Sequence, residues 1–390
     1  MQFPPKPPPQ LFPQPQEFPQ ELLAQPQLVA VKSLIFLPPS FIYGVLYDPV
    51  PVNVSWFCAQ HENNLSETFF AFRHMILISK TGLISLMQRV RKQIEAEWED
   101  WEPWMEEAVT VAVLDTGIGR HPDLTGRLVC FHDFVKQRNL MYDDNGHGTH
   151  ICGILCGSGY LSEGRYRGLA PNTRLVVGKV LDSNGDGMTE NMLAGLDWVL
   201  DNRKRYGIRI LNISVGIGNL NQIEKEIALK RKMEEVWNSG IVVVCAAGNK
   251  GPEDGTISSV GGSEKVITVG CHDGSFCSDN PRRCETYSGR GEFASVRRKP
   301  DIVAPGTDIM SCNVYCQKNH GKVRNPYITK SGTSMATPIV SGAIALLLQK
   351  YPGMSNEAVK QKLTYSAVDL GEPWNKQGWG MVNVKRLLQD

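Results

Sequence analysis

Five short apolar runs, separated by glycine turns and helical stretches, constrain the fold of this 390-residue chain more than any other feature. Each run is nearly continuous in apolar, often β-branched residues, as expected of strands buried on both faces of a sheet. The runs are 109–114, 175–180, 208–213, 241–246 and 266–269. Helical patterns lie between and after them at 147–156, 189–203, 223–239 and 333–350. This alternation predicts an α/β fold with a mostly parallel central sheet and helices on both faces, a three-layer sandwich.

The N-terminal part of the chain does not follow this pattern. Thirteen of the 24 prolines precede residue 52, and the fixed φ and missing amide proton of proline favour polyproline II over packed structure. We therefore expect residues 1–82 to form a disordered leader, or to include a mis-assigned start, with translation beginning at Met75 or Met87.

Residues 83–106 form a second segment. Over 83–100, apolar residues recur at helical spacing between charged ones, which predicts an amphipathic helix that packs on residues downstream. A short pro-region is one role for this helix and the linker after it. Residues 107–390 then form the α/β domain.

The charge balance argues against nucleic acid and membrane partners. Lys and Arg total 41 and Asp and Glu total 40, a net charge of +1, which attracts neither nucleic acid nor an acidic membrane surface. The apolar stretch 28–47 contains Lys32 and two prolines, so it lacks the 18 or more apolar residues of a spanning helix. A proline and glutamine tract stands where a secretory signal would begin, so we expect a cytoplasmic protein.

The cysteine count argues against a disulfide scaffold. Ten cysteines are few for a chain of this length, and we expect reduced thiols packed as small apolar side chains. A loose cluster lacks the two-residue spacing of common zinc sites, which makes a metal there the less favoured alternative and leaves no predicted metal site. Its members are Cys271, Cys277, Cys284, Cys312 and Cys316.

Three polar motifs contain the side chains that a single reaction, acyl transfer by a serine, would need. Asp115 ends the first apolar run, at the sheet edge where open α/β folds bind ligands. His147 begins a helical stretch, and Ser334 lies at the positive end of the long apolar helix. Alone, the aspartate could cap a turn and the histidine could be structural. Together they supply the nucleophile, the proton acceptor and the orienting carboxylate that acyl transfer by a serine requires.

These residues carry a resemblance to the subtilisin-like serine proteases, or subtilases, over about residues 107–385. The family's motifs stand in its order as Asp115-Thr116-Gly117, His147-Gly148-Thr149-His150 and Gly332-Thr333-Ser334-Met335-Ala336. The chain is most similar to bacterial intracellular forms, through His121-Pro122-Asp123-Leu124, residues 142–146 and residues 263–270.

The resemblance implies a serine endopeptidase with a subtilisin-like catalytic domain over 107–390. Asp115 would orient the imidazole, His147 would act as general base and then general acid, and Ser334 would form the acyl-enzyme. His150 would pack nearby without a catalytic role. Asn249, three residues after the 241–246 run, matches the family's oxyanion-hole asparagine.

The expected partners are protein or peptide substrates bound as extended strands. Two segments match the family's substrate-lining strands: Ser214, Val215 and Gly216, and Gly185, Asp186 and Gly187. Asp186 would favour a basic side chain. No cofactor is expected to be required, and the resemblance leaves structural calcium unsupported, because residues 157–167 differ from the family's calcium loop. An EF-hand over 182–193 is rejected because its twelfth position is Leu193, where a bidentate Glu is needed.

Two alternatives stay open at this point. One is an esterase, since the sequence around Ser334 resembles a nucleophile elbow. Its triad order would be serine, acid, histidine, whereas this chain runs Asp, His, Ser. The other is a catalytically silent binding protein on a subtilase scaffold, since a fold does not guarantee chemistry.

Overall fold

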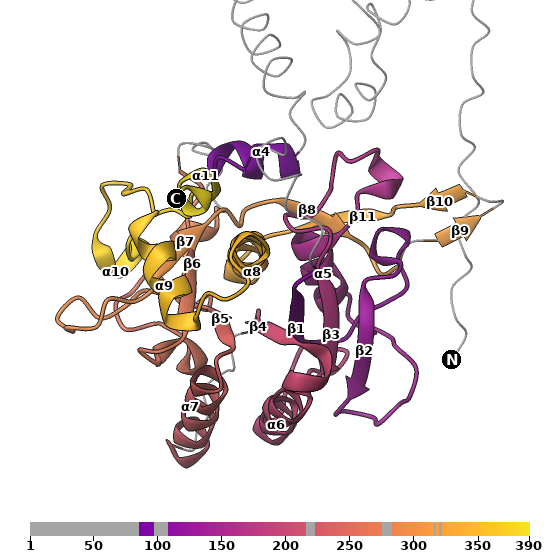
Figure 1. The fold of residues 1–390 in the computed structure, drawn as a ribbon, viewed down its shortest axis with the longest axis horizontal. Helices are drawn as coiled ribbons and strands as arrows, with labels where there is room; N and C mark the ends of the chain where they lie inside the picture. Colours follow the sequence, from indigo (N-terminus) through magenta and orange to yellow (C-terminus); the bar gives the residue numbers. More distant parts are fainter. Residues whose placement is uncertain (1–85, 97–107, 216–222, 275–282, 316, 320–321) are drawn as a thin grey trace, which may run out of the picture. The chain divides into compact units, whose positions relative to one another are not determined.

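The central sheet contains seven parallel strands in the order β2-β3-β1-β4-β5-β6-β7 (Figure 1). The computed structural model describes residues 86–96, 108–215, 223–274, 283–315, 317–319 and 322–390. The strands are β1 (Thr110–Asp115), β2 (Leu128–Asp133), β3 (Arg174–Lys179), β4 (Ile208–Ile213), β5 (Val242–Ala246), β6 (Ile267–Cys271) and β7 (Ile302–Ala304). The predicted parallel sheet is confirmed, and its five apolar runs are β1, β3, β4, β5 and β6.

Helices cover both faces of this sheet, as predicted. The helices α5 (His147–Cys156) and α8 (Thr333–Lys350) lie on one face, and α6 (Thr189–Tyr206) and α7 (Ile223–Asn238) lie on the other (Figure 1). Shorter helices are α4 (Leu86–Gln93), α9 (Asn356–Tyr365), α10 (Trp374–Gln377) and α11 (Val384–Leu388). Two antiparallel pairs complete the described fold: β8 (Ile309–Cys312) with β11 (Tyr327–Lys330), and β9 (Gln317–Asn319) with β10 (Lys322–Arg324).

Single 3₁₀ turns lie in the connections between these elements. They are η5 (Pro122–Leu124), η6 (Tyr160–Ser162), η7 (Ser259–Gly262) and η8 (Cys284–Thr286).

Helix α8 is the apolar centre of the fold. Every one of its residues except Ser334 and Lys350 is buried, because it packs against the sheet and against α5 and α11. A helix that is apolar all round belongs in a core. The half-buried hydroxyl of Ser334 is therefore an exception within its own helix, and it lies in the first turn.

Strands β2 and β7 were not predicted, and their positions explain why. Both lie at the edges of the sheet. In β2 only Asp133 is buried, so its sequence lacks the continuous apolar run of a central strand. Strand β7 has three residues, too few to show a period.

Helix α4 packs into the same core, as its amphipathic pattern predicts. Met87, Val90 and Ile94 are at most 1% exposed, and the Val384 amide donates to the Ile94 carbonyl oxygen at 2.7 Å. The helix ends at Gln93, earlier than the predicted residue 100, and Glu95 takes a left-handed φ of 48°. The predicted leader, 1–82, and residues 83–85 and 97–106 of the predicted second segment lie outside the described residues.

The cysteine prediction is wrong for one pair. Cys271 at the end of β6 and Cys284 at the start of η8 form a disulfide with their Cα atoms 5.8 Å apart. Their proximity depends on how η8 folds back on the sheet, which spacing alone does not reveal. Cys130, Cys152, Cys156, Cys245 and Cys312 are thiols, as predicted. Cys58, Cys277 and Cys316 lie outside the described residues.

The helices of the described ranges were compared with the length and apolar character that a bilayer requires. None of the helices there is both long enough and apolar enough to cross a bilayer.

We predict that truncating Ile94 to Ala destabilises the whole domain. The side chain is fully buried, so removing it should lower the free energy of unfolding by about 2–4 kcal/mol. The exposed Lys92 in the last turn of α4, two residues before Ile94, provides the control, because Lys92→Ala should change stability by less than about 0.5 kcal/mol. Urea unfolding of both variants measures the difference. Equal stabilities would show that α4 is not part of the cooperative unit.

Candidate active site

Asp115 is the last residue of β1 and is fully buried. Its Oδ1 accepts a hydrogen bond from the Thr116 amide at 2.7 Å and lies 2.7 Å from His147 Nδ1. Because an ionised carboxylate only accepts hydrogen bonds, Nδ1 must carry the proton. Nε2 is then the ring nitrogen that can accept a proton from a neighbouring group.

Two glycines allow His147 to begin α5 beside the strand end. Gly146 precedes the helix with a φ of 93°, a left-handed conformation that favours glycine. A Cβ on Gly148 would lie 2.2 Å from the Gly117 carbonyl oxygen, so any larger residue would push α5 away from the loop after β1. The His147 side chain remains 20% exposed, so part of it is accessible to solvent.

Asp143 fixes the relative positions of these two elements. Its Oδ1 accepts from the Thr116 hydroxyl at 2.9 Å and from the Gly146 amide at 2.7 Å, and its Oδ2 accepts from the Thr149 amide at 2.9 Å. The Gly148 amide in turn donates to the Thr116 hydroxyl at 2.9 Å. One buried carboxylate thus joins the end of β1 to the start of α5. Asp143 lies within the 142–146 segment that resembles the subtilases, and an acid just before a helix start is a capping signal that could have predicted its role.

Asn249 lies against the start of α8. Its side-chain oxygen accepts from the Thr333 amide at 3.1 Å and from the Thr333 hydroxyl at 3.0 Å. A Cβ added to Gly332 would come within 3.2 Å of Asn249 Nδ2, so the amide group lies beside the residues that precede Ser334. The structure therefore brings Asp115 to His147, and Asn249 to the residue before Ser334.

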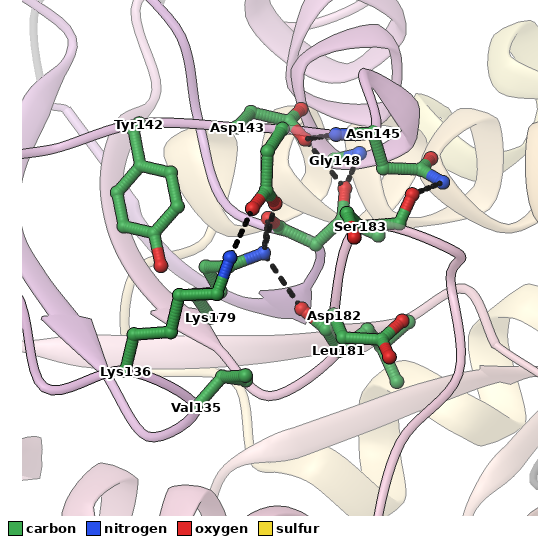
Figure 2. Close-up of polar contacts among 12 residues, drawn as sticks. Val135, Lys136, Tyr142, Asp143, Asn145, Gly148, Lys179, Leu181, Asp182 and Ser183 are labelled. Atoms are coloured by element: carbon green, nitrogen blue, oxygen red, sulfur yellow. Dashed lines mark hydrogen bonds and ion pairs between the residues drawn. The ribbon is translucent and has the colours of Figure 1, made fainter.

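The segment 182–187, after β3, is a tight turn beside the start of α5. Asp182 Oδ1 accepts from the Asn184 amide at 2.8 Å and the Asp186 amide at 3.0 Å, so this carboxylate organises its own turn. Asn145 Nδ2 donates to the Ser183 carbonyl oxygen at 3.0 Å (Figure 2). That contact ties the turn, including exposed Asp186 and Gly187, to the loop that precedes His147.

The second predicted substrate segment follows β4. Ser214 and Val215 are buried, and the Ser214 hydroxyl accepts from Asn212 Nδ2 at 2.9 Å. The Ser341 hydroxyl of α8 donates to Asn212 Oδ1 at 2.8 Å, which connects the strand to the serine-bearing helix. Gly216 lies outside the described residues.

Comparison with known proteins identifies the family. The subtilase family model matches residues 106–380. The chain belongs to the subtilase family. The family comprises serine-type peptidases, and the predicted relationship is confirmed.

Individual relatives of this subtilase agree with that assignment. The serine protease AprX of Bacillus subtilis (strain 168) is 44% identical over 295 residues, which cover 72% of this chain and 66% of AprX. Subtilisin DY of Bacillus licheniformis is 34% identical over 289 residues, covering 72% of this chain and 91% of subtilisin DY. Among solved structures, sphericase is 28% identical with a TM-score of 0.61, over 71% of this chain and 92% of that one.

Two buried groups in the described part of this subtilase have the residue types of metal sites. In the first, Asp123 faces His121 and Cys312, but its carboxylate accepts from the Leu161 amide at 3.1 Å and from the Tyr327 hydroxyl at 2.7 Å. Protein donors thus occupy both oxygens.

The second group contains Asp273 and the disulfide of Cys271 and Cys284. Asp273 Oδ1 accepts from the amides of Gly306 and Thr307 at 3.2 and 3.1 Å. A disulfide offers no thiolate, so this pair suits a metal only after reduction.

Three other polar side chains of α5, those of Cys152, Cys156 and His150, are buried, and burial shifts their pKa values. Burial raises the pKa of Cys156 to about 12 and that of Cys152 well above its usual value, so neither thiol is a nucleophile near neutral pH. His150 Nε2 contacts the carbonyl oxygens of Ile309 and Ile328 at 3.1 and 3.0 Å. Burial, together with the charges of Lys330 and His147, lowers the pKa of His150 to about 3. This histidine is a neutral donor that attaches α5 to β8 and β11, as predicted from its packing role.

We predict that His150 makes the protein less stable in mild acid. Because its pKa is about 3 when folded and 6.5 when unfolded, only the unfolded chain binds a proton between these values. Stability from this group is therefore complete above pH 6.5 and falls by about 1.4 kcal/mol per pH unit below it.

The matched variant is His150→Gln, which keeps a side-chain N–H donor but does not titrate. Urea unfolding at pH 7.5 and pH 5.0 should show a smaller loss of stability in the variant than in the parent protein. Both chains should carry Ser334→Ala to suppress self-digestion. Identical losses would contradict the assignment of this histidine as a buried neutral group.

Proposed function

We propose that this chain is an endopeptidase that hydrolyses peptide bonds in proteins through an Asp115-His147-Ser334 triad and an acyl-enzyme intermediate. The observation that carries the proposal is the 2.7 Å contact between His147 Nδ1 and a buried Asp115 carboxylate. That contact fixes the ring tautomer in which Nε2 accepts a proton. The half-buried Ser334 hydroxyl, on a helix that packs against α5, is the matching nucleophile.

In this mechanism His147 transfers protons in two directions. Nε2 takes the proton of Ser334 Oγ as the oxygen attacks the substrate carbonyl carbon, and Asp115 stabilises the imidazolium that forms. The imidazolium then gives its proton to the leaving amine, and the C–N bond breaks. A water molecule, deprotonated by the same nitrogen, attacks the acyl-enzyme and releases the acid product. Ser334 regains its proton from His147.

The oxyanion of the tetrahedral intermediate needs donors that are already in position. We assign them to Asn249 Nδ2 and the Ser334 amide. The amide and the hydroxyl of Thr333 both donate to the side-chain oxygen of Asn249. The two N–H protons of Asn249 Nδ2 therefore remain for another acceptor. The Ser334 amide is in the first turn of α8, where N–H groups lack acceptors within the helix.

The substrate would bind as an extended strand between Gly185-Asp186-Gly187 and Ser214-Val215-Gly216. The exposed Asp186 carboxylate would favour a basic side chain on that strand. We further propose that catalysis needs no cofactor, that the partners are proteins or peptides and not nucleic acid or membrane, and that the protein works in the cytoplasm.

The first test is Ser334→Ala. Loss of the nucleophile should reduce kcat on an unfolded protein substrate by several orders of magnitude with little change in KM. A fluorophosphonate probe should label Ser334 of the parent chain and leave the variant unlabelled. Absence of labelling in folded parent protein would favour a silent scaffold. Hydrolysis of esters with no cleavage of protein substrates would favour the esterase.

The second test is Asn249→Ala, which should lower kcat by about 10²–10³-fold because one oxyanion donor is lost. Thr333→Val is the matched control, since it removes the hydroxyl contact to the asparagine but keeps Nδ2. We expect less than about tenfold loss in the control. Equal losses in peptide-hydrolysis assays would mean that Asn249 acts only by organising the start of α8.

A further inference from the structure

A fully buried lysine lies directly beneath the candidate active site. Lys179 is the last residue of β3, and its Cα pairs with that of Asp115 across the two strands. Its side chain is 0% exposed. Figure 2 shows it between Leu181 and the loop that carries Asp143 and Asn145. In the sequence this charge stands inside the otherwise apolar run 175–180, where no local pattern indicates a role for it.

Three short hydrogen bonds use all the protons of the Lys179 ammonium. Nζ donates to the Thr116 carbonyl oxygen, the Leu181 carbonyl oxygen and Asp144 Oδ1, each at 2.7 Å. A neutral amine has two protons, so three donated bonds require the charged form. The Tyr142 ring lies 5.1 Å from Nζ and covers it further.

The three acceptors belong to three different parts of the site. Thr116 follows the candidate acid Asp115, and its amide donates to the Asp115 carboxylate. Leu181 leads into the 182–187 turn that would bind substrate. Asp144 lies in the loop before His147, where Asn145 accepts from the His147 amide at 3.1 Å. A single ammonium group thus contacts the segments that carry the candidate acid, the candidate base and one candidate substrate segment, and fixes their relative positions.

We propose that Lys179 is a positioning residue for the peptidase reaction, one that holds the Thr116 peptide so that Asp115 keeps its contact with His147 and that fixes the start of the 182–187 segment. This inference rests on the proposed triad. Lys179 touches none of the reacting groups, so it acts through Thr116 and Leu181.

The energetics favour this role over one in stability alone. Burying the Lys179 ammonium costs desolvation energy, although its partner Asp144 is 26% exposed, and an apolar residue of similar volume often stabilises a core as well or better. Burial pushes the pKa of Asp144 upward, but hydrogen bonds from Lys179 and Lys136 outweigh it and hold that pKa below its usual value. The carboxylate therefore stays ionised and keeps the ammonium in place near neutral pH.

The test is Lys179→Met, which keeps the length of the side chain and removes all three donors. Lys136→Met is the matched control, because Lys136 also donates to Asp144, at 2.9 Å, but is 42% exposed and does not bond Thr116. Active sites are counted by the total fluorophosphonate incorporated at completion, and kcat and KM for a peptide substrate are reported per labelled site.

We expect kcat per labelled site to fall by about 10–100-fold in Lys179→Met, since a small misplacement of catalytic groups costs that much. The rate constant of labelling should fall by a similar factor, KM should rise, and Lys136→Met should match the parent chain. Fewer labelled sites with an unchanged kcat per site would show a purely structural role and overturn the proposal.

Two further comparisons keep the test decisive. If Lys179→Met does not fold, Lys179→Gln can replace it. This variant retains two donors and should show an intermediate kcat per site, and a parent-like value would overturn the proposal.

Ser334→Ala, assayed in parallel, separates the hypothesis of the serine triad from the hypothesis that Lys179 positions it. Full activity of Ser334→Ala would contradict the proposed function itself. An inactive Ser334→Ala together with a parent-like Lys179→Met would contradict only the proposed role of Lys179.

Discussion

The contact between the buried Asp115 carboxylate and His147 Nδ1 is the interaction on which the rest of the site depends. It joins the end of a central strand to the first residue of a helix, and it determines which nitrogen of the ring can accept a proton. Asp115 Oδ1 also accepts a hydrogen bond from the backbone amide of Thr116 at 2.7 Å. The backbone of the loop after β1 therefore helps to orient the carboxylate.

That backbone is fixed by polar groups, although the core around it is apolar. Asp143 connects the start of α5 to the Thr116 hydroxyl, and Lys179 Nζ donates a hydrogen bond to the Thr116 carbonyl oxygen. Such networks are costly to bury unless every member is satisfied, and each satisfied bond restricts the geometry. The buried ionic groups thus serve placement, while the apolar strands and α8 supply most of the stability.

The parallel sheet explains why residues far apart in sequence can share one site. Strands β1, β3, β4 and β5 point the same way, so their carboxyl ends form one edge that carries Asp115, Lys179, Ser214 and the approach to Asn249. Helix α8 arrives at that edge with its N-terminal end, as its contact with Asn249 shows. Sphericase, at only 28% identity, has a similar fold with a TM-score of 0.61, as expected where strand direction matters more than individual core residues.

The sequence by itself determined the family, the central strands and the long helices, and it singled out Asp115, His147, Ser334 and Asn249 as candidate site residues, because buried strands and reactive motifs leave local patterns. Only the tertiary structure decided what depends on contacts between distant segments. The disulfide of Cys271 and Cys284 and the edge strand β2 belong to this class. So does the role of Lys179, since a lysine in a strand reveals its function only when its acceptors on two other loops are known. The local sequence pattern predicts which residues are buried and whether they form a helix or a strand. The direction and the partners of a polar side chain depend on segments that are distant in sequence and pack next to it.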